Sequence, residues 1–172
     1  MESAECSKVP AHGTLKRDEL PLKESMLEPG RPSVLLVDDE PRLRAQLRAV
    51  LDDYEVVVVG EAGTGREGVE LALRLRPQVV LMDLRMPELD GIAATRLLLA
   101  SQPSVAVLIL SAYDDPALMR EARQAGARAY LVKGCRATEL VEAITSAAAD
   151  QAGAAPSGAG APDRLEAGRS SG

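Results

Sequence analysis

Five short apolar runs alternate with five segments of helical periodicity along the middle of this chain, and this alternation restricts the possible folds most strongly. The apolar runs lie at residues 34–37, 56–59, 79–82, 105–110 and 129–132. The helical segments lie near residues 41–51, 66–75, 92–99 and 116–126, with a last one that Thr138 can cap. A helix between two strands makes the strands parallel, and strands that are apolar along their whole length are typical of a sheet covered on both faces.

The alternation therefore predicts an α/β protein of the (βα)5 doubly wound class, a flavodoxin-like three-layer sandwich. In this class the parallel strands have the order 2-1-3-4-5, so the first and third strands are neighbours. Leu, Val and Ala must build the core, because 46% of the residues are hydrophobic but Phe and Trp are absent. We expect the domain to span residues 33–149, between a disordered N-terminal extension (1–32) and a disordered Gly/Ala/Ser/Pro-rich tail (150–172).

Charge and composition argue against several classes of function. A net charge of −6 and a pI near 4.9 are unlike those of a nucleic-acid-binding protein. Cys6 and Cys135 lack the spacing of metal ligands and His12 is the only histidine, so neither a zinc site nor a disulfide framework is expected. No apolar run has the length of a membrane helix, and the N-terminus lacks a signal-peptide core. We therefore expect a cytoplasmic protein that contacts neither membrane nor nucleic acid.

Polar residues suited to phosphate chemistry stand at the ends of four apolar runs. Asp38 and Asp39 follow the first run, Asp83 the third, Ser111 the fourth and Lys133 the fifth. Parallel strands place their carboxyl ends at one edge of the sheet, where open α/β folds bind ligands. Repulsion among the three carboxylates favours a divalent cation such as Mg²⁺, which accepts carboxylate, carbonyl, water and phosphate oxygens. Lys133 and Ser111 suit the oxygens of a phosphoryl group, and a carboxylate oxygen of Asp83 can attack phosphorus.

Each of these residues also has a simpler interpretation when it is taken alone. Asp38 and Asp39 fit a helix N-cap followed by an acid that the helix dipole favours, and Asp83 fits a turn. Ser111 fits an ordinary strand end, and Lys133 fits a surface charge with a buried aliphatic stem. Their joint placement at the ends of adjacent strands is what favours a functional site.

A glycine-rich motif points to a different function. Residues 63–68 read Gly-Thr-Gly-Arg-Glu-Gly after the second strand, and Asp83 lies 20 residues beyond Gly63, which is the spacing of a dinucleotide-binding fingerprint. However, the motif lies in the second strand–helix unit, and the domain has no room for a second mononucleotide-binding half. It also leaves the other strand-end residues without a role. We therefore interpret it as a glycine-rich turn that opens a helix, with a dinucleotide-binding enzyme as a remote alternative.

The segments VLLVDDEP, VVLMDLRMPELDG, VLILSAYDD and GARAYLVKG occur in this order between residues 33 and 148. In order and spacing they resemble the signature segments of the receiver domain of bacterial two-component response regulators. The resemblance implies that Asp83 accepts a phosphoryl group. It also implies that Mg²⁺ is held by Asp38, Asp39, Asp83 and the backbone carbonyl of Arg85.

The same resemblance implies a switch and a partner. Ser111 and Lys133 would contact the phosphoryl group, and Tyr130 would be the switch aromatic that reports its presence. The donor would be a phosphohistidine of a sensor histidine kinase or phosphotransfer protein. The transfer would be self-catalysed, so the chain would not be an enzyme in the usual sense. A second copy or an output partner would bind the face formed by the fourth helix, the fifth strand and the fifth helix.

DLRMPELDG and YLVKG resemble the LuxR-type (NarL/FixJ-type) subfamily, whose members usually carry a C-terminal helix-turn-helix. Residues 150–172 are too few for such a domain, so we expect either a stand-alone receiver or a regulator without its output domain. Gly134 follows the lysine where many receivers have proline, so a cis-proline cannot be assumed. A degenerate receiver that only binds partners and a truncated LuxR-type transcriptional regulator remain as alternatives.

Overall fold

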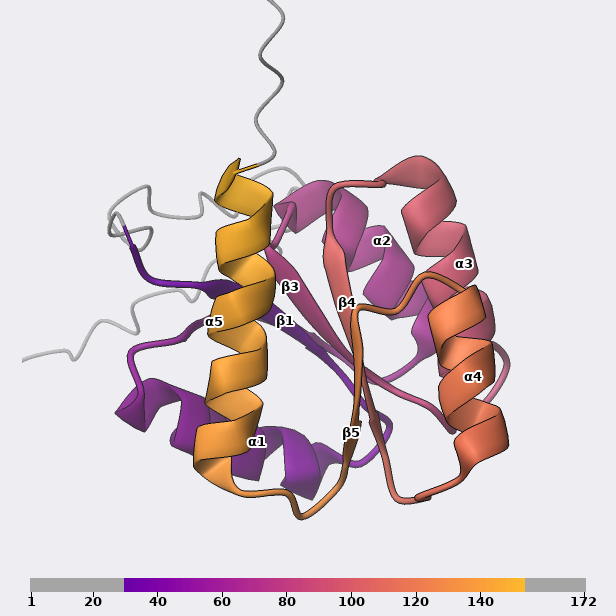
Figure 1. Cartoon of the computed structure of the whole chain (residues 1–172), viewed down its shortest axis with the longest axis horizontal. Coiled ribbons are helices and arrows are strands. Elements are labelled where there is room, and N and C mark those ends of the chain that lie inside the picture. Colours follow the sequence, from indigo (N-terminus) through magenta and orange to yellow (C-terminus); the bar gives the residue numbers. More distant parts are fainter. Residues whose placement is uncertain (1–29, 154–172) are drawn as a thin grey trace, which may run out of the picture.

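A computed structural model describes residues 30–153, in which five strands form one parallel sheet with the order β2-β1-β3-β4-β5. The strands are β1 (Ser33–Val37), β2 (Val57–Ala62), β3 (Val79–Asp83), β4 (Ala106–Ser111) and β5 (Ala129–Val132). The helices are α1 (Pro41–Asp53), α2 (Gly65–Leu75), α3 (Gly91–Ser101), α4 (Pro116–Gln124) and α5 (Ala137–Gly153). Helices α1 and α5 cover one face of the sheet, and α2, α3 and α4 cover the other (Figure 1). The predicted fold class and strand order are confirmed.

The alternation of side chains along each strand divides the core into two layers. In β1, Val34 and Leu36 pack in the layer under α1 and α5, whereas Leu35 and Val37 pack in the layer under α2, α3 and α4. Every residue of β1, β3 and β4 is buried, which is why these strands read as continuous apolar runs. Polar side chains in these three strands are therefore confined to the strand ends.

Strand β2 is longer and later than the predicted run at 56–59. It starts at Val57 and continues through Gly60 and Glu61 to Ala62, because its pairing with β1 resumes after a register shift between Val34 and Leu35. Gly60 and Glu61 end the apolar pattern in the sequence, but the strand continues through both residues. The difference matters because it brings Glu61 to the edge of the sheet where the acidic residues lie.

The last helix differs from the prediction at both ends. The backbone N–H of Leu140 donates to the carbonyl of Arg136, so the helix begins before Thr138. Thr138 therefore lies inside the first turn and does not cap the helix as predicted. At the other end the helix continues to Gly153, beyond the predicted end of the domain, and an ion pair between Asp150 and Arg128 ties its last turns to the start of β5. Apart from residues 30–32 and 150–153, the extensions predicted to be disordered lie outside the described residues. No helix between residues 30 and 153 is long and apolar enough to cross a membrane.

The glycine-rich motif is used for close packing of α2. A Cβ atom at Gly65 would lie 2.4 Å from the carbonyl oxygen of Leu89, and one at Gly68 would lie 2.6 Å from a methyl group of Val37. Helix α2 can therefore approach β1 and the loop before α3 only because these positions lack side chains. Packing accounts for both glycines without a bound nucleotide.

Candidate functional site

The loops that follow β1 and β3 bring three carboxylates together at the carboxyl edge of the sheet. One oxygen from each of Asp38, Asp39 and Asp83 lies within 4.8 Å of the other two. The two strands are neighbours with Val37 opposite Met82, so the residues that follow them emerge side by side. Asp38 and Asp83 are only 3% and 4% exposed, whereas Asp39 is exposed. The structure thus brings together the three acids that the sequence placed at strand ends.

Lys133, at the end of β5, reaches into this acidic cluster. Its Nζ lies 2.8 Å from Oδ2 of Asp38 and 2.9 Å from Oδ1 of Asp83. The backbone N–H of Lys133 donates to the carbonyl of Ser111 at 2.7 Å, which fixes the strand end from which the side chain departs. Burial alone would lower the pKa of Lys133, but the two carboxylates outweigh it and hold the pKa above its ordinary value. The lysine is therefore a fixed positive charge between two buried acids.

One lysine does not neutralise the cluster. Burial raises the pKa of Asp83, the charge of Asp38 raises it further, and Lys133 offsets only part of this rise. Buried carboxylates that lack sufficient positive charge are a site where an additional cation is favoured. A metal ion would restore the balance without any further basic side chain.

Asp38 tests whether such a cation fits the residues that are present. Its Oδ1 accepts the backbone N–H of Glu40 at 2.8 Å. Its Oδ2 is buried and lies 2.8 Å from the ammonium of Lys133. A buried carboxylate oxygen beside two further carboxylates belongs to a hard oxygen donor set of the kind that Mg²⁺ prefers. The residues therefore fit a Mg²⁺ ion.

Ser111 and Tyr130 meet through the backbone of a residue that the sequence analysis did not single out. The buried hydroxyl of Ser111 accepts the N–H of Tyr113 at 3.1 Å, and it can still donate its own proton to an oxygen in the site. The hydroxyl of Tyr130 donates to the carbonyl of the same Tyr113 at 2.7 Å. The loop between β4 and α4 is thus linked both to the floor of the site and to β5.

Arg85 lies beside this loop rather than pointing away from it. Its guanidinium carbon is 5.5 Å from the centre of the Tyr113 ring, a cation–π contact that joins the loop after β3 to the loop after β4. The role of the Arg85 backbone carbonyl as a metal ligand stays a prediction. The sequence offered no signal for Tyr113, because both of its hydrogen bonds are made by backbone atoms.

Arg44 was also missed by the sequence analysis. Its guanidinium donates to the backbone carbonyl of Asp38 and forms an ion pair with Glu61, at 3.2 Å. An arginine on an amphipathic helix is usually a solvated charge, so only the hydrogen bond to the carbonyl of Asp38 distinguishes this one from Arg42 or Arg48.

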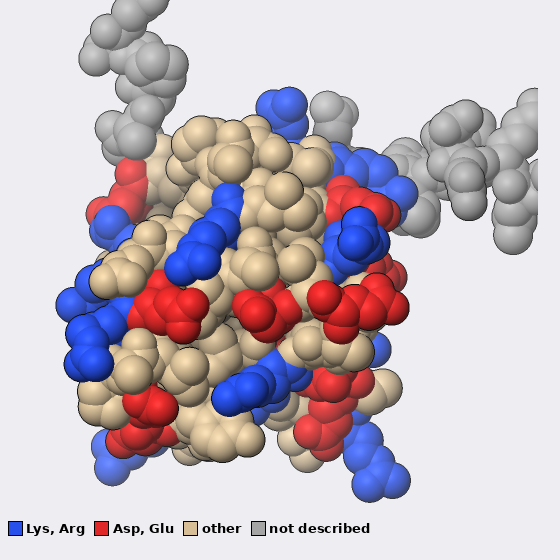
Figure 2. Space-filling view, turned by 90° about the vertical axis from the view of Figure 1, so that its right-hand side faces the viewer, with Lys and Arg blue, Asp and Glu red and all other residues tan. Residues whose placement is uncertain are grey.

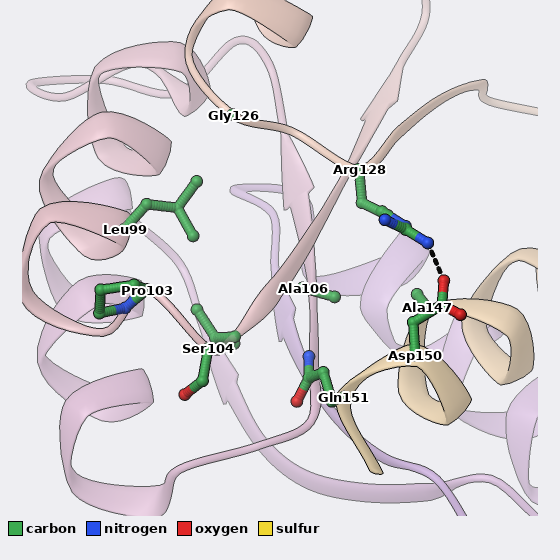
Figure 3. A pocket seen from close by; sticks show the side chains of 10 residues that line it. Leu99, Pro103, Ser104, Ala106, Gly126, Arg128, Ala147, Asp150 and Gln151 are labelled. Atoms are coloured by element: carbon green, nitrogen blue, oxygen red, sulfur yellow. Dashed lines mark ion pairs between the residues drawn. The ribbon is translucent and has the colours of Figure 1, made fainter. Parts of the chain in front are cut away.

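A separate hollow of about 400 Å³ lies at the opposite edge of the sheet, where β4 and β5 begin (Figure 3). Apolar groups such as Leu99 and Ala106 line it, and the Arg128–Asp150 ion pair borders it. None of the strand-end acids, Ser111 or Lys133 lines this hollow. We assign it no part in the chemistry at the carboxyl edge.

Comparison with known proteins gives a consistent result. The family model of the response regulator receiver domain matches residues 34–145. The response regulator GacA of Pseudomonas aeruginosa is 40% identical over 119 residues, which cover 69% of this chain and 56% of that protein. The chain spans about half the length of the curated relatives it matches.

Solved structures with the same fold include two regulators of related kinds. The signal receiver domain of the putative response regulator NarL from Mycobacterium tuberculosis is 35% identical, with a TM-score of 0.67, covering 70% of this chain and 98% of that one. A two-component response regulator of the LuxR family from Aurantimonas sp. is 32% identical, with a TM-score of 0.67, covering 70% and 86%. This chain belongs to the family of response regulator receiver domains.

Proposed function

We propose that this receiver domain accepts a phosphoryl group on Asp83 from a phosphohistidine of a partner kinase or phosphotransfer protein, in the presence of Mg²⁺. The observation that carries the proposal is the buried carboxylate of Asp83 beside two further carboxylates and a lysine within ion-pair distance. In the transfer, an oxygen of Asp83 forms a bond to phosphorus while the bond from phosphorus to the histidine nitrogen breaks. The ring nitrogen keeps the electron pair of that bond, so the donor returns to its unphosphorylated state.

The chain's own residues position the group and balance its charge. The ammonium of Lys133 already contacts Asp83, and a phosphoryl group on that carboxylate would bring an oxygen within its reach. Ser111 can donate its proton to a second phosphoryl oxygen. Mg²⁺, held by Asp38, Asp39, Asp83 and the Arg85 carbonyl, would neutralise charge on the phosphoryl oxygens. We infer that the transfer is self-catalysed and needs no separate enzyme.

The backbone of Tyr113 offers a route from the site to the surface. If the Ser111 hydroxyl moves toward a phosphoryl oxygen while it still accepts the Tyr113 N–H, that hydrogen bond draws the loop toward the site. That shift weakens the hydrogen bond between Tyr130 and the Tyr113 carbonyl, which frees the Tyr130 ring to change rotamer. The coupling then lies in different hydrogen bonding in two states, as any ligand-driven switch requires.

The surface that would read the switch consists of α4, β5 and α5. The neighbouring surface over α3 and α4 carries basic and acidic side chains interspersed, including the exposed ion pair of Arg96 with Glu121 (Figure 2). Mixed charges suit a reversible protein contact better than contact with nucleic acid. We propose a second copy or an output protein as the partner. We also propose that the chain is of the LuxR type, which its similarity to the Aurantimonas regulator supports.

The test is an intact-mass measurement after incubation with acetyl phosphate and Mg²⁺. The wild-type protein should gain about 80 Da, the mass of one phosphoryl group. Asp83→Asn should show no gain, and addition of a chelator should prevent the gain in the wild type. Asp90→Asn is the control, because this acid caps α3 and is not a member of the acidic cluster, so the substitution should leave the gain intact. Absence of a mass gain with any phosphodonor would favour a degenerate receiver, and tight NAD binding would favour the dinucleotide-binding alternative.

A further inference from the structure

Arg44 connects α1 to two other segments at the acidic edge of the sheet. Its side chain is only 17% exposed, and Nη1 donates to the backbone carbonyl of Asp38. Nε lies 3.2 Å from Oε2 of Glu61, near the end of β2. A planar guanidinium can serve both acceptors at once because its donors point in fixed, separate directions.

The carboxylate of Glu61 is itself held in place. Its other oxygen, Oε1, accepts from Nε of Arg48 at 2.7 Å, so both oxygens are engaged by arginines from successive turns of α1. Burial alone would raise the pKa of Glu61, but Arg48 and Arg44 outweigh it and lower the pKa. Glu61 is therefore an ionised and doubly anchored acceptor at neutral pH.

The same end of β2 holds Asp38 from its other side. The N–H of Asp38 donates to the carbonyl of Ala62 at 3.1 Å. Both backbone groups of Asp38 are thus tied to adjacent residues of β2, one directly and one through Arg44 and Glu61. Its side chain has little freedom left, because Oδ1 also accepts the N–H of Glu40.

We propose that Arg44 is a positioning residue for the acidic site: anchored on Glu61, it fixes the backbone of Asp38 so that the carboxylate faces Asp83 and Lys133. This inference rests on the proposed function, since it takes the acidic cluster to be a Mg²⁺ site. Three carboxylates within 4.8 Å of one another repel, and an unrestrained loop would relax by turning one of them away. Arg44 opposes that relaxation and preserves the arrangement that a metal requires.

The charge of Arg44 and its positioning role act on Mg²⁺ in opposite directions. As a cation near the site, Arg44 repels Mg²⁺, so removal of its charge alone should tighten binding. As a positioning residue it preorganises Asp38, so removal of its hydrogen bond should weaken binding. The sign of the change in affinity therefore separates the two roles.

The experiment compares Mg²⁺ affinities of the unphosphorylated protein by titration calorimetry. Arg44→Gln should bind Mg²⁺ about ten-fold more weakly than the wild type, as is usual when a residue that orients a metal ligand is lost. Arg44→Lys should lie between them, because its ammonium can still reach one of the two acceptors but cannot serve both in the fork geometry. Arg42→Gln is the matched control: this exposed arginine belongs to the same helix, and its loss should leave the affinity unchanged or slightly higher.

Hydrogen exchange of the metal-free protein supplies an independent result. In Arg44→Gln, and more weakly in Arg44→Lys, the amides of Asp38 and Glu40 should exchange faster, while that of Leu108 in β4 should not change. Unchanged or tighter Mg²⁺ binding by Arg44→Gln would overturn the proposal, as would uniformly faster exchange across the sheet. If the wild type binds no Mg²⁺, the proposed function fails, but exchange at Asp38 and Glu40 still decides the positioning role. If Arg44→Gln does not fold, both measurements are made on Arg44→Lys.

Discussion

The two sides of the site differ strongly in how far hydrogen bonds and burial restrain their residues. The acidic side comprises Asp38, Asp39 and Asp83 with the residues that hold them, Arg44, Glu61 and Gly91. The switch side comprises Ser111, Tyr113 and Tyr130, on the loop after β4 and on β5. On the acidic side, Asp38 is tied through both backbone groups and its side chain, and Asp83 ends a fully buried strand. On the switch side, residues 112–117 are exposed, and β5 buries only Leu131.

The difference matches the separate tasks that the proposed function gives to the two sides. Phosphoryl transfer needs acids and lysine in a fixed geometry, since small displacements of reacting groups are costly. Signal output needs an element whose alternative arrangement is close in free energy, and such elements come from weakly packed regions. Helix α4 suits this role because Ala122 is its only fully buried residue. We therefore expect the proposed chemistry to take place on the acidic side and the switch side to move.

The largest loss of stability should come from adding a side chain at Gly91, where α3 packs closely against the backbone of Asp83 on the acidic side. A Cβ at Gly91 would lie 2.1 Å from the carbonyl oxygen of Asp83, so Gly91→Ala must push the end of β3 or α3 aside. We expect a loss of about 3 kcal/mol in the free energy of unfolding, typical of strong overpacking, measured by urea denaturation. On the switch side, a Cβ at Gly134 would meet nothing within 4 Å, and only its positive φ of 92° opposes substitution. Gly134→Ala should cost about 1 kcal/mol; equal losses would contradict the contrast between the sides.

Lys133 is where the two sides meet, because it departs from β5 and pairs with two acids. Lys133→Met should lower the free energy of unfolding of the metal-free protein by about 2 kcal/mol, because Asp38 and Asp83 lose their cation. Asp39→Asn should have the opposite sign, leaving the metal-free protein equally or more stable while it weakens Mg²⁺ binding. Thermal unfolding with and without Mg²⁺ measures both, and the metal should raise the wild-type Tm. Strong destabilisation by Asp39→Asn would mean that the acids serve as structural caps.

The site residues that could be predicted from the sequence are those whose position follows from topology. Once the strands are known to be parallel, Asp38, Asp83, Ser111 and Lys133 must reach the same edge, whatever the details of packing. The strand order followed from the same alternation of strands and helices. The boundary of β2 was less predictable, because Gly60 ends an apolar run although the pairing with β1 continues there after a register shift.

The residues that escaped prediction act through contacts without a sequence pattern. Arg44 resembles any solvated arginine of a surface helix until its hydrogen bond to the backbone of Asp38 is known. Tyr113 contributes its N–H and carbonyl, which every non-proline residue possesses. Thr138 is a good capping residue in general, but α5 already begins before it. Backbone contacts of this kind depend on the exact course of loops, which residue types alone do not specify.

Tyr130→Phe tests the difference in restraint between the two sides, because it removes a hydrogen bond from the switch side alone. It removes the hydrogen bond to the carbonyl of Tyr113, which is partly accessible to water, so the free energy of unfolding should fall by only about 0.5 kcal/mol. Exchange of amides in residues 112–115 should become faster, while that of Asp38 on the acidic side should not change. Tyr54→Phe, at an exposed tyrosine after α1, is the control for loss of a phenol hydroxyl. Unchanged exchange in the loop would show that Tyr130 does not restrain it.

The smallest effect concerns Glu61 on the acidic side and how its contribution to the free energy of unfolding depends on pH. The pKa of Glu61 lies below its ordinary value, because Arg48 and Arg44 favour the carboxylate more than burial disfavours it. An acid whose pKa is lowered by folding stabilises the protein above its unfolded pKa, about 4.3 for glutamate, and that stabilisation is lost as the pH falls through the folded value. Glu61→Gln should therefore be less stable than the wild type by about 0.5 kcal/mol at pH 7, with a difference that shrinks below about pH 4.3. Urea denaturation from pH 7 to pH 3 measures this, with Glu70→Gln on α2 as the control for an exposed acid. A difference that stays constant with pH would mean that Glu61 acts through packing, and that Arg44 is anchored by shape rather than by charge.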